Sequence, residues 1–146
     1  GMAPTTDIGE KHCIHPPKKF EVGQRLAAQA LAKTYGQTGF NPNHPQVGGY
    51  VIKDGQAKLT LTNCELGPTP WYGGPITGFE IAGADKVFHK ANASVTGFHE
   101  ITVWSDAVPQ PVAVRYSFRN FAPGNLKSVF GIPAIPFRTD DWNDVR

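Results

Sequence analysis

The chain has 146 residues, which fits one domain of ordinary size. Hydrophobic residues make up 40% and charged residues 18%, so the chain can bury a core and is not compositionally disordered. Fourteen basic and twelve acidic residues leave a formal net charge of +2, which argues against a nucleic-acid partner or an anionic membrane surface. No apolar stretch approaches the ~20 residues that span a bilayer, so we expect no membrane partner.

Glycine and proline are unusually frequent, with 16 and 13 residues, against a usual share of ~12% for the two together. Combined with 11% aromatic residues, this composition favours short strands joined by many turns. The predicted fold class is therefore mainly β: an antiparallel β-sandwich preceded by one α-helix.

The helix is predicted over residues 18–35. Pro17 suits an early helical position, where its missing N–H costs nothing, and Gly36 supplies a stop. The apolar residues of this segment fall on neighbouring i, i+4 rows and form one stripe: Val22, Leu26, Ala27, Ala30, Leu31 and Tyr35. We expect this stripe either to remain an exposed apolar face or to be buried against the sandwich or a second copy of the chain.

The β region begins after residue 40. Residues 48–63 predict a hairpin around Asp54-Gly55, because this dipeptide tolerates the positive φ angles of a tight turn. Four more candidate strands follow, at residues 74–83, 86–97, 99–106 and 111–120. Their spacing of ~8–12 residues indicates a sandwich. Residues 121–142 contain several prolines and are expected to wrap over the surface with one edge strand.

Five reactive side chains lie within nine positions: Asp7, Glu10, His12, Cys13 and His15. The residues alone leave four interpretations open: a polar loop without chemistry, a zinc site, a Cys13–His15 nucleophile pair, and a general base. In the last, His15 serves a nucleophile located elsewhere, with Asp7 or Glu10 orienting its ring. The spacing matches no familiar zinc frame, and nothing marks Cys13 as activated, so no metal or cofactor is expected.

Several motifs follow one another in order from about residue 7 to residue 142. They are DIGE at 7–10, IHP at 14–16, GGPITGFEIAG at 73–83, PVAVRY at 111–116 and PFRTDDW at 136–142. This set resembles the sialate O-acetylesterase family, whose 9-O-acetylesterase-like members are SGNH-type carbohydrate esterases. The resemblance implies hydrolysis of O-acetyl esters on sugars by serine acyl transfer.

The resemblance also implies roles for single residues. His15 matches the catalytic histidine of the IHP motif, and Asp7 matches the acidic position of the DIGE segment, with Glu10 as its neighbour. Family members often carry an acidic residue two positions before the histidine, where this chain has Cys13. The group that orients the His15 ring therefore stays open, and a backbone carbonyl is a further candidate.

The nucleophilic serine of that family lies in an N-terminal flavodoxin-like α/β domain, and this sequence contains no Gly-Asp-Ser or Gly-Glu-Ser motif of that kind. The resemblance therefore implies a C-terminal segment that is inactive alone. Residues 1–39 would end the esterase domain, with the helix as its last helix, and residues 40–146 would form an accessory sandwich. Implied partners are the missing SGNH esterase domain and an acetylated carbohydrate, and self-association could cover the helix. The family suggests a secreted or periplasmic location.

An alternative function is a non-catalytic carbohydrate-binding or structural β-sandwich module. Trp71, Trp104 and Trp142 are candidates for a sugar-stacking platform, although packing is the more frequent role of tryptophan. Arg115 alternates with Val114 and Tyr116 on a predicted strand, and we expect it to form an ion pair across the domain interface.

Overall fold

The computed structural model describes residues 1–15, 17–70 and 74–143, so Trp71 lies outside the described residues. In chain order the elements are α1 (Lys19–Lys33), β1 (Gln46–Lys53), β2 (Gln56–Thr62), β3 (Pro68–Thr69), β4 (Phe79–Ala82), β5 (Phe88–Lys90), β6 (Asn92–Gly97), β7 (Glu100–Trp104), β8 (Ala113–Tyr116), β9 (Lys127–Ser128) and β10 (Phe137–Arg138). The prediction of a mainly β chain with a helix near residues 18–35 is confirmed. Within the described part of the chain, no helix is long and apolar enough to cross a membrane.

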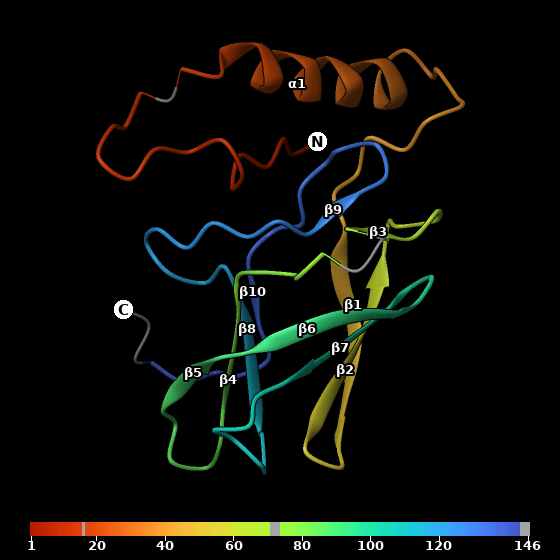
Figure 1. The fold of residues 1–146 in the computed structure, drawn as a ribbon. Coiled ribbons are helices and arrows are strands. Elements are labelled where there is room, and N and C mark those ends of the chain that lie inside the picture. The colour runs from red at the N-terminus through yellow and green to blue at the C-terminus, as the bar shows by residue number, and fades with distance from the viewer. Residues whose placement is uncertain (16, 71–73, 144–146) are drawn as a thin grey trace.

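The strands form two four-stranded sheets and a small ribbon. The first sheet has the order β1-β2-β7-β6, the second has the order β10-β8-β4-β5, and β3 pairs with β9. Each of these strand pairs is antiparallel. The inward residues of both four-stranded sheets form one buried core, as expected for a sandwich. Helix α1 lies across one end of this sandwich, on the side of β3 and β9, and the β1–β2 turn lies at the opposite end (Figure 1).

The predicted hairpin is present. Asp54 and Gly55 have φ angles of 53° and 75°, which place both turn residues in the left-handed region. Strand β2 then alternates between exposed residues and the buried residues Ala57, Leu59 and Leu61. The residues of the turn and the alternation of buried and exposed residues in β2 therefore together determine how β1 pairs with β2.

The single strand predicted over residues 86–97 is two strands in different sheets. Strand β5 pairs with β4 in the second sheet, whereas β6 pairs with β7 in the first. Ala91 sits at the corner between them, is 5% exposed, and donates its backbone N–H to the carbonyl of Phe79 at 3.0 Å. Alternation continues through the corner, so periodicity could not reveal that the strand changes sheets.

The C-terminal region closes the core. Strand β10 pairs with the edge of β8, as expected for the tail. Leu126 is fully buried and its backbone N–H donates to the hydroxyl of Tyr116 at 3.0 Å. The ring of Tyr116 packs against that of Phe79, with centroids 4.8 Å apart. The tail is therefore partly core, because its apolar residues cover the open side of the sandwich.

Arg115 forms its ion pair within the sandwich, and the expectation of a pair across a domain interface is wrong. Its Nε and Nη2 donate to the two carboxylate oxygens of Asp140 at 2.9 and 2.7 Å. Its guanidinium also lies 4.0 Å from the ring centroid of Phe88. Burial alone raises the pKa of the Asp140 carboxyl, but the hydrogen bonds and charge of Arg115 outweigh it and hold that pKa below its usual value. The pair ties the tail to β8.

Replacing Asp140 with Asn should lower the free energy of unfolding by about 3 kcal/mol, because it replaces a carboxylate that accepts two charge-assisted hydrogen bonds from the buried guanidinium with a neutral amide. Glu80→Gln is the matched control, since the Glu80–Arg119 pair is more exposed, with Arg119 48% and Glu80 23% exposed, and should contribute about 1 kcal/mol or less. Urea denaturation followed by tryptophan fluorescence measures both values. Equal losses for the two variants would contradict the assignment.

Candidate functional site

The carboxylate of Asp7 is held by two cations from different elements. Nη1 and Nη2 of Arg25 donate to Oδ1 and Oδ2 of Asp7, each at 2.8 Å, and Nζ of Lys127 lies 3.0 Å from Oδ2. The side chains of Asp7 and Arg25 are 8% and 10% exposed. Arg25 also donates to the backbone carbonyl of Pro4 at 2.7 Å. One buried cluster, which we call the Asp7 cluster (Asp7, Arg25 and Lys127), therefore joins the N-terminal segment, α1 and β9.

The charges of the cluster determine the protonation of Asp7. Burial alone raises the pKa of the Asp7 carboxyl, but hydrogen bonds and charge from Arg25 and Lys127 outweigh it, so that pKa lies below its usual value. Asp7 is accordingly ionised at neutral pH and accepts from both cations.

Helix α1 turns a polar face toward the sandwich and leaves part of its apolar stripe exposed, which agrees with the first of the two arrangements expected for that stripe. The two buried residues of the helix are Arg25 and Gln29, which lie one turn apart. Nε2 of Gln29 donates to the carbonyl of Pro42 at 2.7 Å. Leu26 and Tyr35 of the expected stripe are 54% and 73% exposed. In this orientation the buried donors of Arg25 and Gln29 reach the Asp7 carboxylate and the Pro42 carbonyl, whereas Oε1 of Gln29 has no hydrogen-bond partner among the described residues.

His15 lies in the exposed loop that leads into α1. The thiol of Cys13 donates to the backbone carbonyl of His15 at 3.4 Å, and the neighbouring Ile14 is 90% exposed. Within the described part of the chain, no hydrogen bond or ion pair holds the His15 ring. The structure thus brings Asp7 to Arg25 and Lys127, and it does not bring Asp7 to His15.

The remaining residues of the reactive cluster also lie on this exposed loop. Glu10 and Cys13 form an isolated backbone bridge that closes a short turn, and Glu10, His12 and Cys13 are all exposed. Cys13 and Cys64 are both free thiols. In residues 1–15, 17–70 and 74–143, no three His, Cys, Asp or Glu side chains come together in a way that could hold a metal ion. The loop is therefore a set of accessible polar groups without a preassembled catalytic partner.

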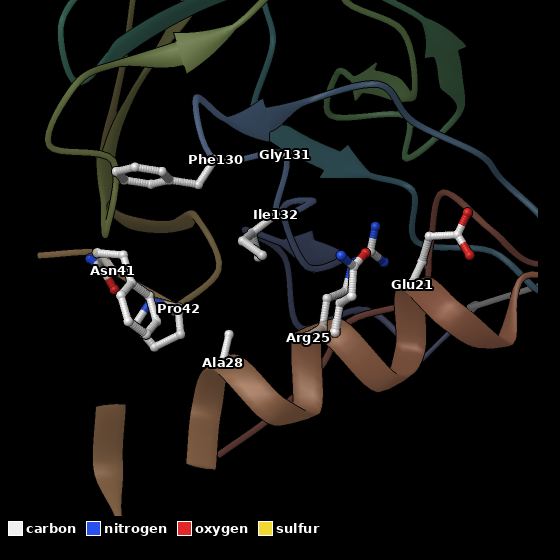
Figure 2. Close-up of a pocket in the computed structure, with 10 residues that line it drawn as sticks. Glu21, Arg25, Ala28, Asn41, Pro42, Phe130, Gly131 and Ile132 are labelled. Atoms are coloured by element: carbon white, nitrogen blue, oxygen red, sulfur yellow. The ribbon is translucent and has the colours of Figure 1, made fainter. Parts of the chain in front are cut away.

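A groove of about 390 Å³ lies between α1 and the segment of residues 130–132. Figure 2 shows Glu21, Arg25 and Ala28 rising from the helix on one side, with Phe130 and Ile132 opposite them. The groove shows that α1 does not pack flush on the sandwich. Its attachment depends on the polar contacts of Arg25 and Gln29.

Sequence reasoning missed Arg25 and Lys127 as the partners of Asp7. Arg25 and Gln29 do carry a signal, because they are polar residues at i, i+4 next to an apolar stripe and define a second face of the helix. Lys127 carried no comparable signal, because its contact with Asp7 spans most of the chain.

Comparison with known proteins finds similarity among the solved structures. No family model matches the chain, and no curated protein matches it. Among solved structures, the chain is similar to a carbohydrate acetylesterase from Xanthomonas citri, with 38% sequence identity and a TM-score of 0.83. The match covers 93% of this chain and 31% of that chain. At 38% identity the two chains are alike in sequence as well as in fold, and this likeness is limited to about a third of the acetylesterase.

Replacing Asp7 with Asn should detach the N-terminal segment and α1 while leaving the sandwich folded. The buried Arg25 guanidinium then loses its countercharge, which costs about 3 kcal/mol, whereas the sandwich keeps its own core. Hydrogen–deuterium exchange should show faster exchange in α1 and unchanged protection in β2 and β7. Glu10→Gln, an exposed acidic residue of the same segment, is the control, and equal effects of both variants would contradict this role.

The same contact predicts a pH dependence. Because the folded-state pKa of Asp7 is lowered, its stabilisation is fully present above the unfolded-state pKa of about 4 and is lost as pH falls through the folded-state value. In the parent chain, the protection of the α1 backbone amides from hydrogen exchange should therefore decrease as the pH is lowered. In Asp7→Asn this decrease should be smaller. An unchanged acid profile in the variant would show that other carboxylates govern the docking of α1.

Proposed function

We propose that this chain is one part of a carbohydrate O-acetylesterase of the sialate O-acetylesterase (SGNH) type, and that another part carries the serine nucleophile. The observation that carries the proposal is the 38% identity over 93% of this chain to a carbohydrate acetylesterase of which it spans 31%. A serine block elsewhere in the polypeptide accounts for its absence from these 146 residues.

The outward face of α1 supports a docked domain on that side. Successive residues turn by about 100°, so Gly23 and Ala27 lie opposite Arg25, and both are exposed. Phe20 and Leu26 flank them and are 74% and 54% exposed. Full burial of such side chains contributes about 1.5–3 kcal/mol each. We commit to the α/β esterase domain as the occupant of this face, because the similar acetylesterase is about three times the length of this chain.

In the complete enzyme, His15 is the general base. Its ring is exposed just ahead of α1, which places it at the edge of the surface proposed to meet the esterase domain. It accepts the serine proton as the serine oxygen attacks the acetyl carbonyl, then returns a proton to the departing sugar oxygen. Water next attacks the acyl-enzyme, His15 takes a proton from this water and gives it to the departing serine oxygen, and acetate leaves. No metal or cofactor is needed for these steps.

Asp7 acts in this proposal as a positioning residue. Both of its carboxylate oxygens are engaged by Arg25 and Lys127, and the first of these belongs to the helix that follows His15. The cluster thereby fixes both ends of the segment that contains His15: Asp7 precedes the loop of residues 8–15, and Arg25 belongs to the helix that follows it. The group that accepts the second ring N–H of His15 then comes from the docked domain or from the backbone.

In a polypeptide that joins this chain to its serine-bearing domain, His15→Ala should lower kcat on an acetylated sugar by about 10⁴-fold, because a serine hydroxyl is a poor nucleophile without its base. His12→Ala on the same loop is the matched control and should retain parent turnover. The 146-residue chain alone should hydrolyse p-nitrophenyl acetate no faster than a boiled sample. Near-parent turnover of His15→Ala would overturn the assignment.

The docking surface has its own test in Phe20→Ser. In the 146-residue chain the substitution should change the free energy of unfolding by less than about 0.5 kcal/mol, since the ring is already exposed. In the joined polypeptide it should cost about 1.5–3 kcal/mol. Lys33→Gln, an exposed change on the same helix, should have little effect in either protein.

The competing occupants give different results. A second copy on the helix face would make the effect of Phe20→Ser in the isolated chain depend on protein concentration, together with a dimer in light scattering. A non-catalytic or purely structural module would leave turnover of the joined polypeptide insensitive to His15→Ala. Either result would replace the present proposal.

A further inference from the structure

We propose that the outer face of sheet β1-β2-β7-β6 carries a binding platform for an extended, uncharged polysaccharide chain, centred on Trp104. This platform is separate from the loop of His15. Trp104 pairs with Gln56, the residue that begins β2 next to the β1–β2 turn. That turn lies at the opposite end of the sandwich from α1 (Figure 1).

The ring of Trp104 points away from the core. Its neighbour Val103 is fully buried, and successive residues of a strand face opposite sides, so Trp104 lies on the outer face, where it is partly exposed. The other outward residues of β2, β6 and β7 are mostly hydroxyl-bearing or charged: Lys58, Thr60, Ser94, Glu100 and Thr102. A large apolar ring in such a surface has no evident role in packing the core.

Two amides flank the ring. Gln56 and Asn92 stand directly opposite Trp104 on β2 and β6, so all three side chains share one face. Both amides are exposed, and within the described residues neither side chain is bonded to another protein group. Each amide offers two donors and an acceptor that remain available to a ligand.

The spacing and chemistry of this row match a sugar chain. Adjacent strands lie about 4.8 Å apart, so Gln56 and Asn92 are separated by about 10 Å across the indole. The C–H face of a pyranose can stack on the indole, and its hydroxyls can reach the amides on both sides, since an indole combines an apolar face with a polar edge. The row therefore offers stacking at its centre and hydrogen bonding at both sides.

The neighbouring charges favour an uncharged ligand. In the rows next to Trp104, Nζ of Lys58 lies 3.6 Å from Oε1 of Glu100. At the β1 end of the Trp104 row itself, Lys53 pairs with Gln56 and its Nζ lies 3.9 Å from Asp54. The two charges of each pair oppose one another, so these pairs add no net charge to this face of the sheet. Trp142 provides no comparable platform, because it packs against Phe88 with centroids 5.6 Å apart.

The test is calorimetric titration of the 146-residue chain with cellohexaose, xylohexaose and hexagalacturonate. We expect binding of at least one neutral hexamer, weakened at least 10-fold by Trp104→Ala and about 2- to 10-fold by Gln56→Ala or Asn92→Ala. Val51→Ala is the control, since Val51 is 62% exposed on β1 and lies outside the row of Trp104. It should bind as the parent does.

No binding of either neutral hexamer by the parent, or equal binding by Trp104→Ala, would overturn the platform, and tighter binding of hexagalacturonate would overturn the uncharged class. If circular dichroism shows that Trp104→Ala does not fold, the proposal is tested by Gln56→Ala and Asn92→Ala, and unchanged sugar binding in both would overturn it. Loss of sugar binding would leave the esterase proposal intact, because that proposal is tested by turnover of His15 variants.

Discussion

The attachment of α1 to the rest of the molecule depends on one carboxylate. Asp7 comes from the N-terminal segment, Arg25 from the helix and Lys127 from β9, and their charged groups meet in a mostly buried position. Taking these ions out of water is costly, so the cluster persists only because two parallel Arg25–Asp7 bonds and the Lys127 contact offset that cost. Without it, no other ion pair within the described residues would join the helix to the sandwich.

This constraint determines which side of α1 faces the sandwich. Arg25 must point inward to reach Asp7, and Gln29 follows one turn later to reach the Pro42 carbonyl. Part of the apolar surface is then left on the outside, where Phe20 and Leu26 remain exposed, whereas Val22, Ala30 and Leu31 are half-buried. An amphipathic helix normally buries its apolar stripe, and the exposed part of the apolar surface of α1 is the structural basis for proposing a second domain on that side.

A second buried ion pair attaches the C-terminal segment to β8. Arg115 on β8 binds Asp140 beyond β10, and Phe88 covers the guanidinium from β5. The two pairs join residues 18 and 25 positions apart in the sequence. Together with the ring contact of Tyr116 and Phe79, they make the sandwich a fixed support on which the loop of His15 and the row of Trp104 occupy different ends.

The sequence by itself determined the class of fold and the main local elements. Turn chemistry at Asp54-Gly55, the period of two in β2 and the helical period of residues 18–35 are local signals, and the structure confirms the hairpin and helix that they predict. The sequence also marked the loop of Asp7 and His15, through its density of reactive side chains and its resemblance to carbohydrate esterases.

Only the tertiary structure decided what these elements contact. The corner at Ala91, which sends β5 and β6 into different sheets, and the partners of Arg115 depend on segments that are distant in sequence. The inward face of α1 was decided by Asp7 and Lys127, because a buried charge must find its countercharge wherever the fold supplies one. Periodicity measures how apolar each face of a helix is, and it contains no information on which charged group another part of the chain will present.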